Sequence, residues 1–273
     1  MASDFGITVY LLVMSAVLGL VMGSFINCWA WRSTHGESVM HGRSHCPACN
    51  HVLGVRDLVP VFSWLAAGRK CRYCGEPVSA RYPATEIVCA LVFVLLALRY
   101  GFSLETVEMM AFAGILLYLS LTDLDKFIIP NGCIFAAIGV RVVYLVVSFI
   151  TGQVSTDDIV YYVASAFGMG IVLVVIVLAA DKVFGRASMG GGDLKLYFVA
   201  ALYFGWQQTL FLVIVSCIIG IIVAVVTPKR AEEDPEESTM KRSIPFGPSI
   251  AAACIITALV GQQAISWYMG LLL

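Results

Sequence analysis

The chain has 273 residues, of which 60% are hydrophobic and only 13% are charged, and its net charge at pH 7 is −1. A soluble globular protein is roughly 45–50% apolar and about a quarter charged. This composition, with a mean hydropathy of +0.89, therefore excludes an ordinary soluble domain and indicates a polytopic membrane protein. No basic helix or tail stands apart from the apolar segments, which argues against a nucleic-acid partner.

The apolar runs predict an all-α membrane protein with about eight spans, because a helix needs roughly 20 residues to cross a bilayer. In chain order the expected spans are Ile7–Trp31, Ala84–Tyr100, Thr106–Thr122, Asn131–Ile150, Ile159–Ala180, Leu194–Phe204, Gln207–Val226 and Ser249–Leu271. The first is too long for a signal-peptide core and lacks a basic start, so we expect it to be retained. The sixth is short and follows a run of glycines, which indicates a helix that begins near the membrane edge.

The polar segments divide the chain and set its orientation. We expect a first span within 1–31, a polar loop at 32–83 and a bundle of spans at 84–273. Cytoplasmic loops are rich in Lys and Arg. If the amino terminus faces outward, the loops 32–83, 123–130, 181–193 and 227–248 share the cytoplasmic side. These loops and their flanks hold fifteen of the seventeen Lys and Arg residues, all except Arg99 and Arg141. The acidic stretch Lys229–Met240 is expected to be a disordered connection.

Two carboxylates mark the predicted cytoplasmic edge of the bundle. Asp123 ends one apolar run, and Asp193 follows the glycines Gly190, Gly191 and Gly192. Charged groups at the edge of hydrocarbon are costly, so they indicate a functional site. Two carboxyl groups that share a proton can hydrolyse a peptide, one as a base towards water and the other as a donor to the carbonyl oxygen. We therefore predict that Asp123 and Asp193 form one catalytic pair.

The neighbours of the two acids leave alternatives open. The glycines are expected to let a substrate strand approach closely and to permit positive φ. Asp125 competes with Asp123, but on one helix the two would point roughly 200° apart, so only one could face Asp193. Alternatively, Asp193 only caps the helix that starts at Leu194.

The polar loop 32–83 contains two Cys-x-x-Cys pairs, separated by twenty-one residues: Cys46 with Cys49, and Cys71 with Cys74. This separation lies just outside the usual range of about 15–20 for a four-cysteine zinc site. Four thiolates complete a tetrahedron around Zn²⁺, and a reducing cytosol favours metal over disulfide. We predict structural zinc. The alternative is a membrane dithiol oxidoreductase that uses the two pairs. His45 and His51 flank the first pair and could replace a thiolate.

In these motifs the chain resembles the type IV prepilin peptidases, which are polytopic aspartic endopeptidases of the bacterial inner membrane. The Gly-x-Gly-Asp signature of the family is matched by Gly190–Asp193, followed by Leu194-Lys195-Leu196. The stretch with the other catalytic aspartate is matched by Leu121–Asn131, which assigns that role to Asp123. Further signatures are matched by Gly23–Asn27, by Arg81–Pro83 with Glu86, and by Ile244–Pro248.

The resemblance implies an activity and a location. The expected substrate is a type IV prepilin or a type II secretion pseudopilin, cut after its basic leader at the cytoplasmic face of a multi-pass protein in membrane lipid. Gly190, Gly192 and Lys195 would support the peptidase site.

Family members with the cysteine loop also methylate the new amino terminus, with S-adenosylmethionine as co-substrate. Asn27, Arg32 and Glu86 are candidates for binding the methyl donor, and the alternative is that they are buried polar groups satisfied between spans. A transporter is a third possibility, but it would need ionisable groups near the midplane and repeated halves.

Overall fold

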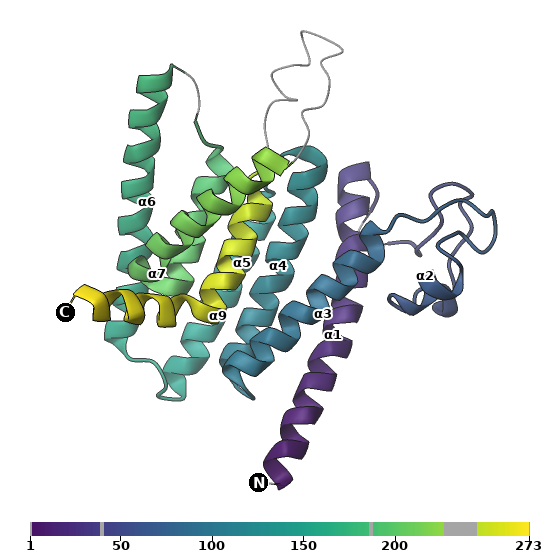
Figure 1. Cartoon of the computed structure of the whole chain (residues 1–273), viewed down its shortest axis with the longest axis horizontal. Coiled ribbons are helices and arrows are strands. Elements are labelled where there is room, and N and C mark those ends of the chain that lie inside the picture. Colours follow the sequence, from purple (N-terminus) through teal and green to yellow (C-terminus); the bar gives the residue numbers. More distant parts are fainter. Residues whose placement is uncertain (1, 39–40, 186–187, 227–244, 273) are drawn as a thin grey trace. The chain divides into compact units, whose positions relative to one another are not determined.

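The computed structural model describes residues 2–38, 41–185, 188–226 and 245–272, so the predicted connection Lys229–Met240 lies outside the described residues. The elements in order are α1 (Ala2–His35), η1 (Val55–Asp57), α2 (Phe62–Ala66), α3 (Arg81–Tyr100), α4 (Leu104–Lys126), α5 (Asn131–Ile150), α6 (Thr156–Phe184), α7 (Gly191–Val226) and α9 (Gly247–Leu272) (Figure 1). The described residues form no β-strand, only two isolated bridges. The all-α prediction is confirmed.

Seven helices of the described chain are long and apolar enough to cross a membrane. They correspond to the eight expected spans, because the spans expected at Leu194–Phe204 and Gln207–Val226 both belong to α7. That helix is interrupted at Gly205, whose φ of 73° and ψ of 174° are not helical. A Cβ on Gly205 would lie 2.6 Å from the ring of Tyr161, so a larger residue would not fit against α6.

Arg141, in the middle of α5, bonds the carbonyl groups at this interruption. A break in a helix frees carbonyl groups that the next turn would otherwise bind. The Arg141 guanidinium donates hydrogen bonds to the carbonyl oxygens of Leu202 (2.9 Å) and Tyr203 (3.3 Å), and it lies 4.3 Å from the ring centre of Tyr162. The side chain is only 3% exposed, so the carbonyls and the aromatic rings replace water around the buried cation.

The chain divides into two compact units, Met1–Leu121 and Thr122–Leu273. In the first unit, α1 and α3 pack along each other. Gly19 and Gly23 of α1 lie where an added Cβ would come within 2.5 Å of Ala90 Cα and 2.8 Å of Glu86 Cα. Small residues four apart allow such close approach of membrane helices.

In the second unit, α6 and α9 pack against α7, and α5 makes a smaller contact with it. One part of its core is the cluster of Ala166, Met169, Ala201 and Leu202. The helix ends of this unit carry the predicted carboxylates.

Candidate active site and metal centre

Asp123 lies in the last turn of α4 and is only 6% exposed. Its Oδ2 accepts a 2.8 Å hydrogen bond from the backbone N–H of Gly247, the first residue of α9. The first N–H groups of a helix have no partner within that helix, and the N-terminal end carries partial positive charge. Asp123 therefore satisfies one of these groups in α9.

Asp193 lies in the first turn of α7 and is partly buried. The backbone N–H of Gly190 donates a hydrogen bond to the Asp193 carboxylate. The negative charge of Asp123 lies near enough to repel a negative charge on Asp193. Because α7 begins at Gly191, Asp193 lies inside the helix and does not occupy the capping position before its first residue. The structure thus places the two predicted carboxylates near enough for the charge of Asp123 to influence Asp193, with Asp123 in the last turn of α4 and Asp193 in the first turn of α7.

The backbone conformation of the glycines before Asp193 differs from the predicted one. None of Gly190, Gly191 and Gly192 has a positive φ, so the expected left-handed conformation is wrong. What they provide is space. A Cβ on Gly192 would lie 3.0 Å from Ile129 Cβ, and one on Gly190 would lie 3.1 Å from Asp193 Oδ2, whereas Gly191 meets nothing within 4 Å.

A turn between α4 and α5 completes this end of the unit. The helix α4 ends where Phe127 takes a φ of 55° and donates its N–H to the carbonyl of Asp123. After Pro130, α5 begins at Asn131, whose side-chain oxygen accepts a 2.9 Å hydrogen bond from Lys195 Nζ. The starts of α5, α7 and α9 therefore meet at the end of α4.

Asp125, the rival to Asp123, is exposed, whereas Asp123 is buried. This difference is expected from the two positions on one helix. Both lie within α4, which continues through Lys126.

The four cysteines of the polar loop come together at one point. All four Sγ atoms lie within 4.8 Å of one another, and those of Cys46 and Cys74 are 3.9 Å apart. Four sulfurs at about 2.3 Å from one tetrahedral zinc ion would be about 3.8 Å apart. A disulfide would need about 2.05 Å, and all four are free thiols. The donor set fits a closed four-thiolate zinc site.

The two pairs are held by the same backbone pattern, repeated twenty-five residues later. Cys46 donates its N–H to His51 and accepts from Asn50, as Cys71 donates to Glu76 and accepts from Gly75. Backbone N–H groups of Cys74 and Tyr73 lower the pKa of the Cys71 thiol to about 7, whereas desolvation and the adjacent cysteine thiols raise the pKa of Cys74. A lowered thiol pKa favours the thiolate, which is the form that binds metal.

The flanking histidines have other contacts. His45 pairs with Glu37 at 3.6 Å and lies edge-on to Trp31. His51 stacks on Tyr73, with ring centres 3.6 Å apart. Among the described residues, the cluster with metal-ligand geometry consists of the four cysteines.

The three candidates for methyl-donor binding are buried, with exposed fractions of 5% for Asn27, 7% for Arg32 and 6% for Glu86. Asn27 donates to the carbonyl of Tyr82, and Arg32 donates to two carbonyls in the loop after α1. Glu86 accepts a 2.7 Å hydrogen bond from the backbone N–H of Val61. Each therefore has a protein partner, as in the alternative interpretation of buried, satisfied groups.

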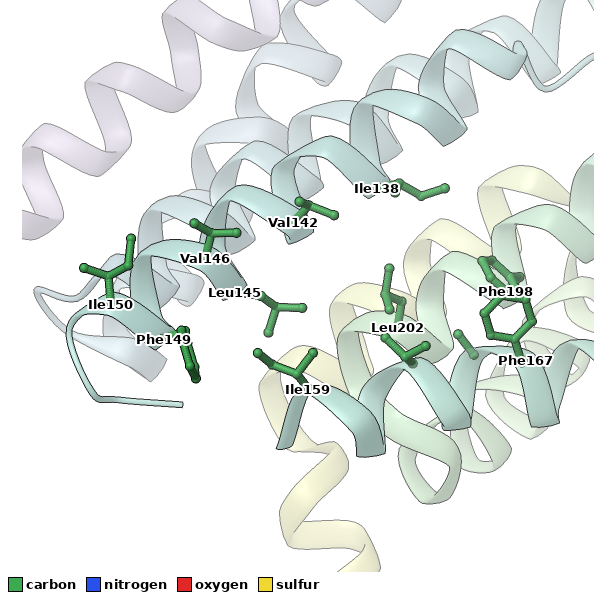
Figure 2. A pocket seen from close by; sticks show the side chains of 12 residues that line it. Ile138, Val142, Leu145, Val146, Phe149, Ile150, Ile159, Phe167, Phe198 and Leu202 are labelled. Carbon is green, nitrogen blue, oxygen red and sulfur yellow. The ribbon is translucent and has the colours of Figure 1, made fainter. Parts of the chain in front are cut away.

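An apolar cavity of about 390 Å³ opens between α5, α6 and α7 (Figure 2). Side chains such as Val142, Phe149, Ile159, Phe167 and Phe198 line it, and its surface contains no polar atom. It offers no proton donor or nucleophile and is therefore not the reaction site.

Two models of known protein families match the chain, one over the cysteine loop and one over the two carboxylates. The family model described as type IV leader peptidase matches residues 110–225, which include Asp123 and Asp193. The model described as the bacterial peptidase A24 N-terminal domain matches residues 17–100, which include the four cysteines. The chain belongs to the type IV leader peptidase family. The predicted resemblance is confirmed, and with it the prediction that the chain is a peptidase.

Individual relatives of this leader peptidase cover nearly the whole chain. One from Bacillus subtilis strain 168 is 29% identical over 93% of this chain and 96% of its own length. One from Pseudomonas putida is 29% identical over 96% of this chain and 95% of its own. One from Myxococcus xanthus is 30% identical over 77% of this chain and 61% of its own. All three are named prepilin leader peptidase/N-methyltransferase, which agrees with the predicted pairing of two activities. No solved structure matches the chain.

One contact of the candidate site was not predicted from the sequence. Gly247 belongs to a predicted family signature, but its hydrogen bond to Asp123 comes from the backbone N–H. Every residue except proline has such a group, so the residue type gives no sign of this contact. The signal available was the glycine itself, at the start of an apolar run and beside Pro248.

Proposed function

We propose that the chain is a membrane aspartic endopeptidase that removes the leader of type IV prepilins or pseudopilins at the cytoplasmic face of the bacterial inner membrane. It would also methylate the new amino terminus with S-adenosylmethionine. The observation that carries the peptidase proposal is the electrostatic influence of Asp123 on Asp193, two residues seventy positions apart in the sequence. The names of the relatives support the substrate and the second activity.

The chemistry follows from two carboxyl groups that hold one proton between them. The ionised carboxylate takes a proton from water as the water oxygen attacks the scissile carbonyl carbon, and the protonated partner donates to the carbonyl oxygen. As the tetrahedral intermediate collapses and the C–N bond breaks, the carboxyl group that took the proton from water gives it to the leaving amine, and a hydroxyl of the intermediate returns its proton to the other carboxylate. The N–H groups of Gly190 and Gly247 would stabilise the charge of the pair at a site where water is scarce.

The glycines and the lysine would serve the substrate. Gly190 and Gly192 leave the entry to Asp193 free of side chains, so a substrate backbone could approach it. Lys195, held by Asn131, would fix the first turn of α7 against α5.

The division into parts is included in the proposal: a first span in 1–31, a zinc loop in 32–83 associated with methylation, and a peptidase bundle in 84–273. Cys46, Cys49, Cys71 and Cys74 would hold a structural Zn²⁺, which would fold the loop and take no part in a reaction. Asn27, Arg32 and Glu86 remain the proposed methyl-donor residues, although a donor would have to replace the protein contacts that they now make.

Mass spectrometry of the amino terminus of a mature pilin tests both activities together. Purified enzyme, a prepilin and S-adenosylmethionine should give a cleaved product that carries one additional methyl group. A cleaved product without the methyl group would remove the methyltransferase proposal, and an uncut precursor would remove both.

A further inference from the structure

A short apolar segment in the polar loop is not explained by peptide cleavage, methylation or zinc binding. Residues 55–66, which contain η1 and α2, are called here the apolar loop segment. Its exposed large side chains are Val55 (83%), Leu58 (41%), Val59 (43%), Phe62 (66%) and Leu65 (56%). Such a concentration of exposed apolar side chains in twelve residues of a polar loop indicates contact with something apolar.

The depth of this segment is fixed by a hydrogen bond to a membrane span. Glu86 accepts the N–H of Val61 at 2.7 Å. Glu86 lies five residues after Arg81, the first residue of α3, and therefore about 7.5 Å along that span. The start of α2 is thus held beside the second turn of a transmembrane helix. If α3 crosses a bilayer from about its first turn, that level would lie at the boundary between headgroups and acyl chains.

The backbone at this point is held in an unfavourable conformation. Val61 is β-branched and has a φ of 63°, which L-residues with branched side chains rarely adopt. Its side chain is partly buried, and its N–H donates a hydrogen bond to Glu86. A strained residue persists only where its surroundings determine it. The attachment of the segment to α3 is therefore a built feature of the fold.

The side chains around the segment match a lipid surface. Trp64 donates its indole N–H to the carbonyl of Val78 and lies under the Arg69 guanidinium, 5.3 Å from its ring centre. Trp and Arg are typical of membrane interfaces, where an apolar body and a polar end are both satisfied. The exposed basic residues near the segment, which could meet anionic headgroups, are Arg56, Arg69, Lys70 and Arg72.

We propose that the apolar loop segment lies in the interface of the bilayer leaflet in which α3 begins, with Phe62 and Leu65 in the acyl region and the basic residues at the headgroups. The segment would hold the cysteine cluster close to the membrane surface, because Asp57 accepts hydrogen bonds from Gly54 and from Tyr73 of the second cysteine pair. This inference does not depend on the proposed function.

Tryptophan quenching in lipid nanodiscs tests the proposal on the full chain. Phe62→Trp and Leu65→Trp each add one fluorophore to the segment, and the emission of the wild type is subtracted. Phosphatidylcholine brominated near the top of the acyl chain should quench most of the added emission, and aqueous iodide should quench little. Glu76→Trp, on the second cysteine pair, is the matched control and should show the opposite pattern.

Two results would overturn the proposal. Quenching of both added tryptophans by iodide but not by brominated lipid would place the segment in water. Quenching by neither reagent would mean that protein covers it. Unchanged zinc content in each variant shows that the loop is folded, so neither result could be attributed to unfolding.

Discussion

The backbone N–H of Gly247 and the carboxylate of Asp123 are joined by a 2.8 Å hydrogen bond, which ties the end of α4 to the start of α9. The two residues are 124 positions apart. The contact requires glycine, because a Cβ at position 247 would lie 2.7 Å from Asp123 Oδ2. The position of one carboxylate of the proposed pair therefore depends on a residue with no side chain.

Gly247→Ala should displace the carboxylate of Asp123. A misplacement of about 1 Å at a reacting group can lower the rate on the order of a hundredfold, so we expect a fall in kcat for prepilin cleavage of between tenfold and a hundredfold. Steady-state cleavage by purified enzyme measures it. Gly132→Ala is the control, since a Cβ there meets nothing within 4 Å. Equal activity of both variants would show that this contact does not position Asp123.

Gly192→Ala should disturb the start of α7, because its Cβ would lie 3.0 Å from Ile129 Cβ and the neighbour would have to move. We expect a fall in cleavage rate of roughly tenfold, in proportion to a displacement smaller than that at Gly247. Gly191→Ala, one residue earlier, has open space and should cleave at nearly the wild-type rate. The prediction is wrong if the two alanines have the same effect.

Arg141→Met should destabilise the second unit. It removes the donor to two carbonyl groups at the break in α7, and unsatisfied buried groups cost about 1–3 kcal/mol each. The thermal midpoint of the protein in detergent should fall. Arg141→Lys should fall less, since an ammonium can still donate. Arg99→Met, at an exposed helix end, is the control. An unchanged midpoint for Arg141→Met would contradict this account of the break.

Elemental analysis of purified protein should find one zinc per chain. Cys46→Ser should lose it, because Cys46 is a buried member of the four-thiol cluster and a closed site needs all four ligands for tight binding. Cys254→Ser, in the core of α9, should keep it. A metal-free wild type whose thiols cycle between reduced and oxidised forms would favour the dithiol oxidoreductase instead.

The extent to which the sequence predicted the molecule depended on the kind of interaction. Apolar runs predicted the spans, because hydrophobic length is a local signal, although the two spans expected at Leu194–Phe204 and Gln207–Val226 are the two parts of one helix, α7, interrupted at Gly205. The cysteine cluster was also predicted, because each pair is local and metal geometry joins the two. The contact of Asp123 with Gly247 was not predicted, since a backbone N–H carries no residue-type signal. Arg141 could be recognised only as a basic residue inside a span, because its partners are carbonyl groups at a break sixty residues away.

The prediction about the glycines before Asp193 failed for a physical reason. Glycine permits positive φ, but it also serves where another chain segment comes close. Here the close segment is Ile129, which leaves no room for a side chain at Gly192. Sequence alone does not distinguish the two.

The central claim, that Asp123 and Asp193 act as one catalytic pair, is tested most directly by prepilin cleavage with Asp123→Asn, Asp193→Asn and Asp125→Asn enzymes purified in detergent. Asparagine keeps the size of the side chain but can neither accept the proton from water nor donate one to the carbonyl oxygen. We predict that the first two variants lose cleavage by at least about a thousandfold, as expected when a member of a joint catalytic unit is removed, and that Asp125→Asn retains it. Full turnover by Asp123→Asn or by Asp193→Asn would contradict the account.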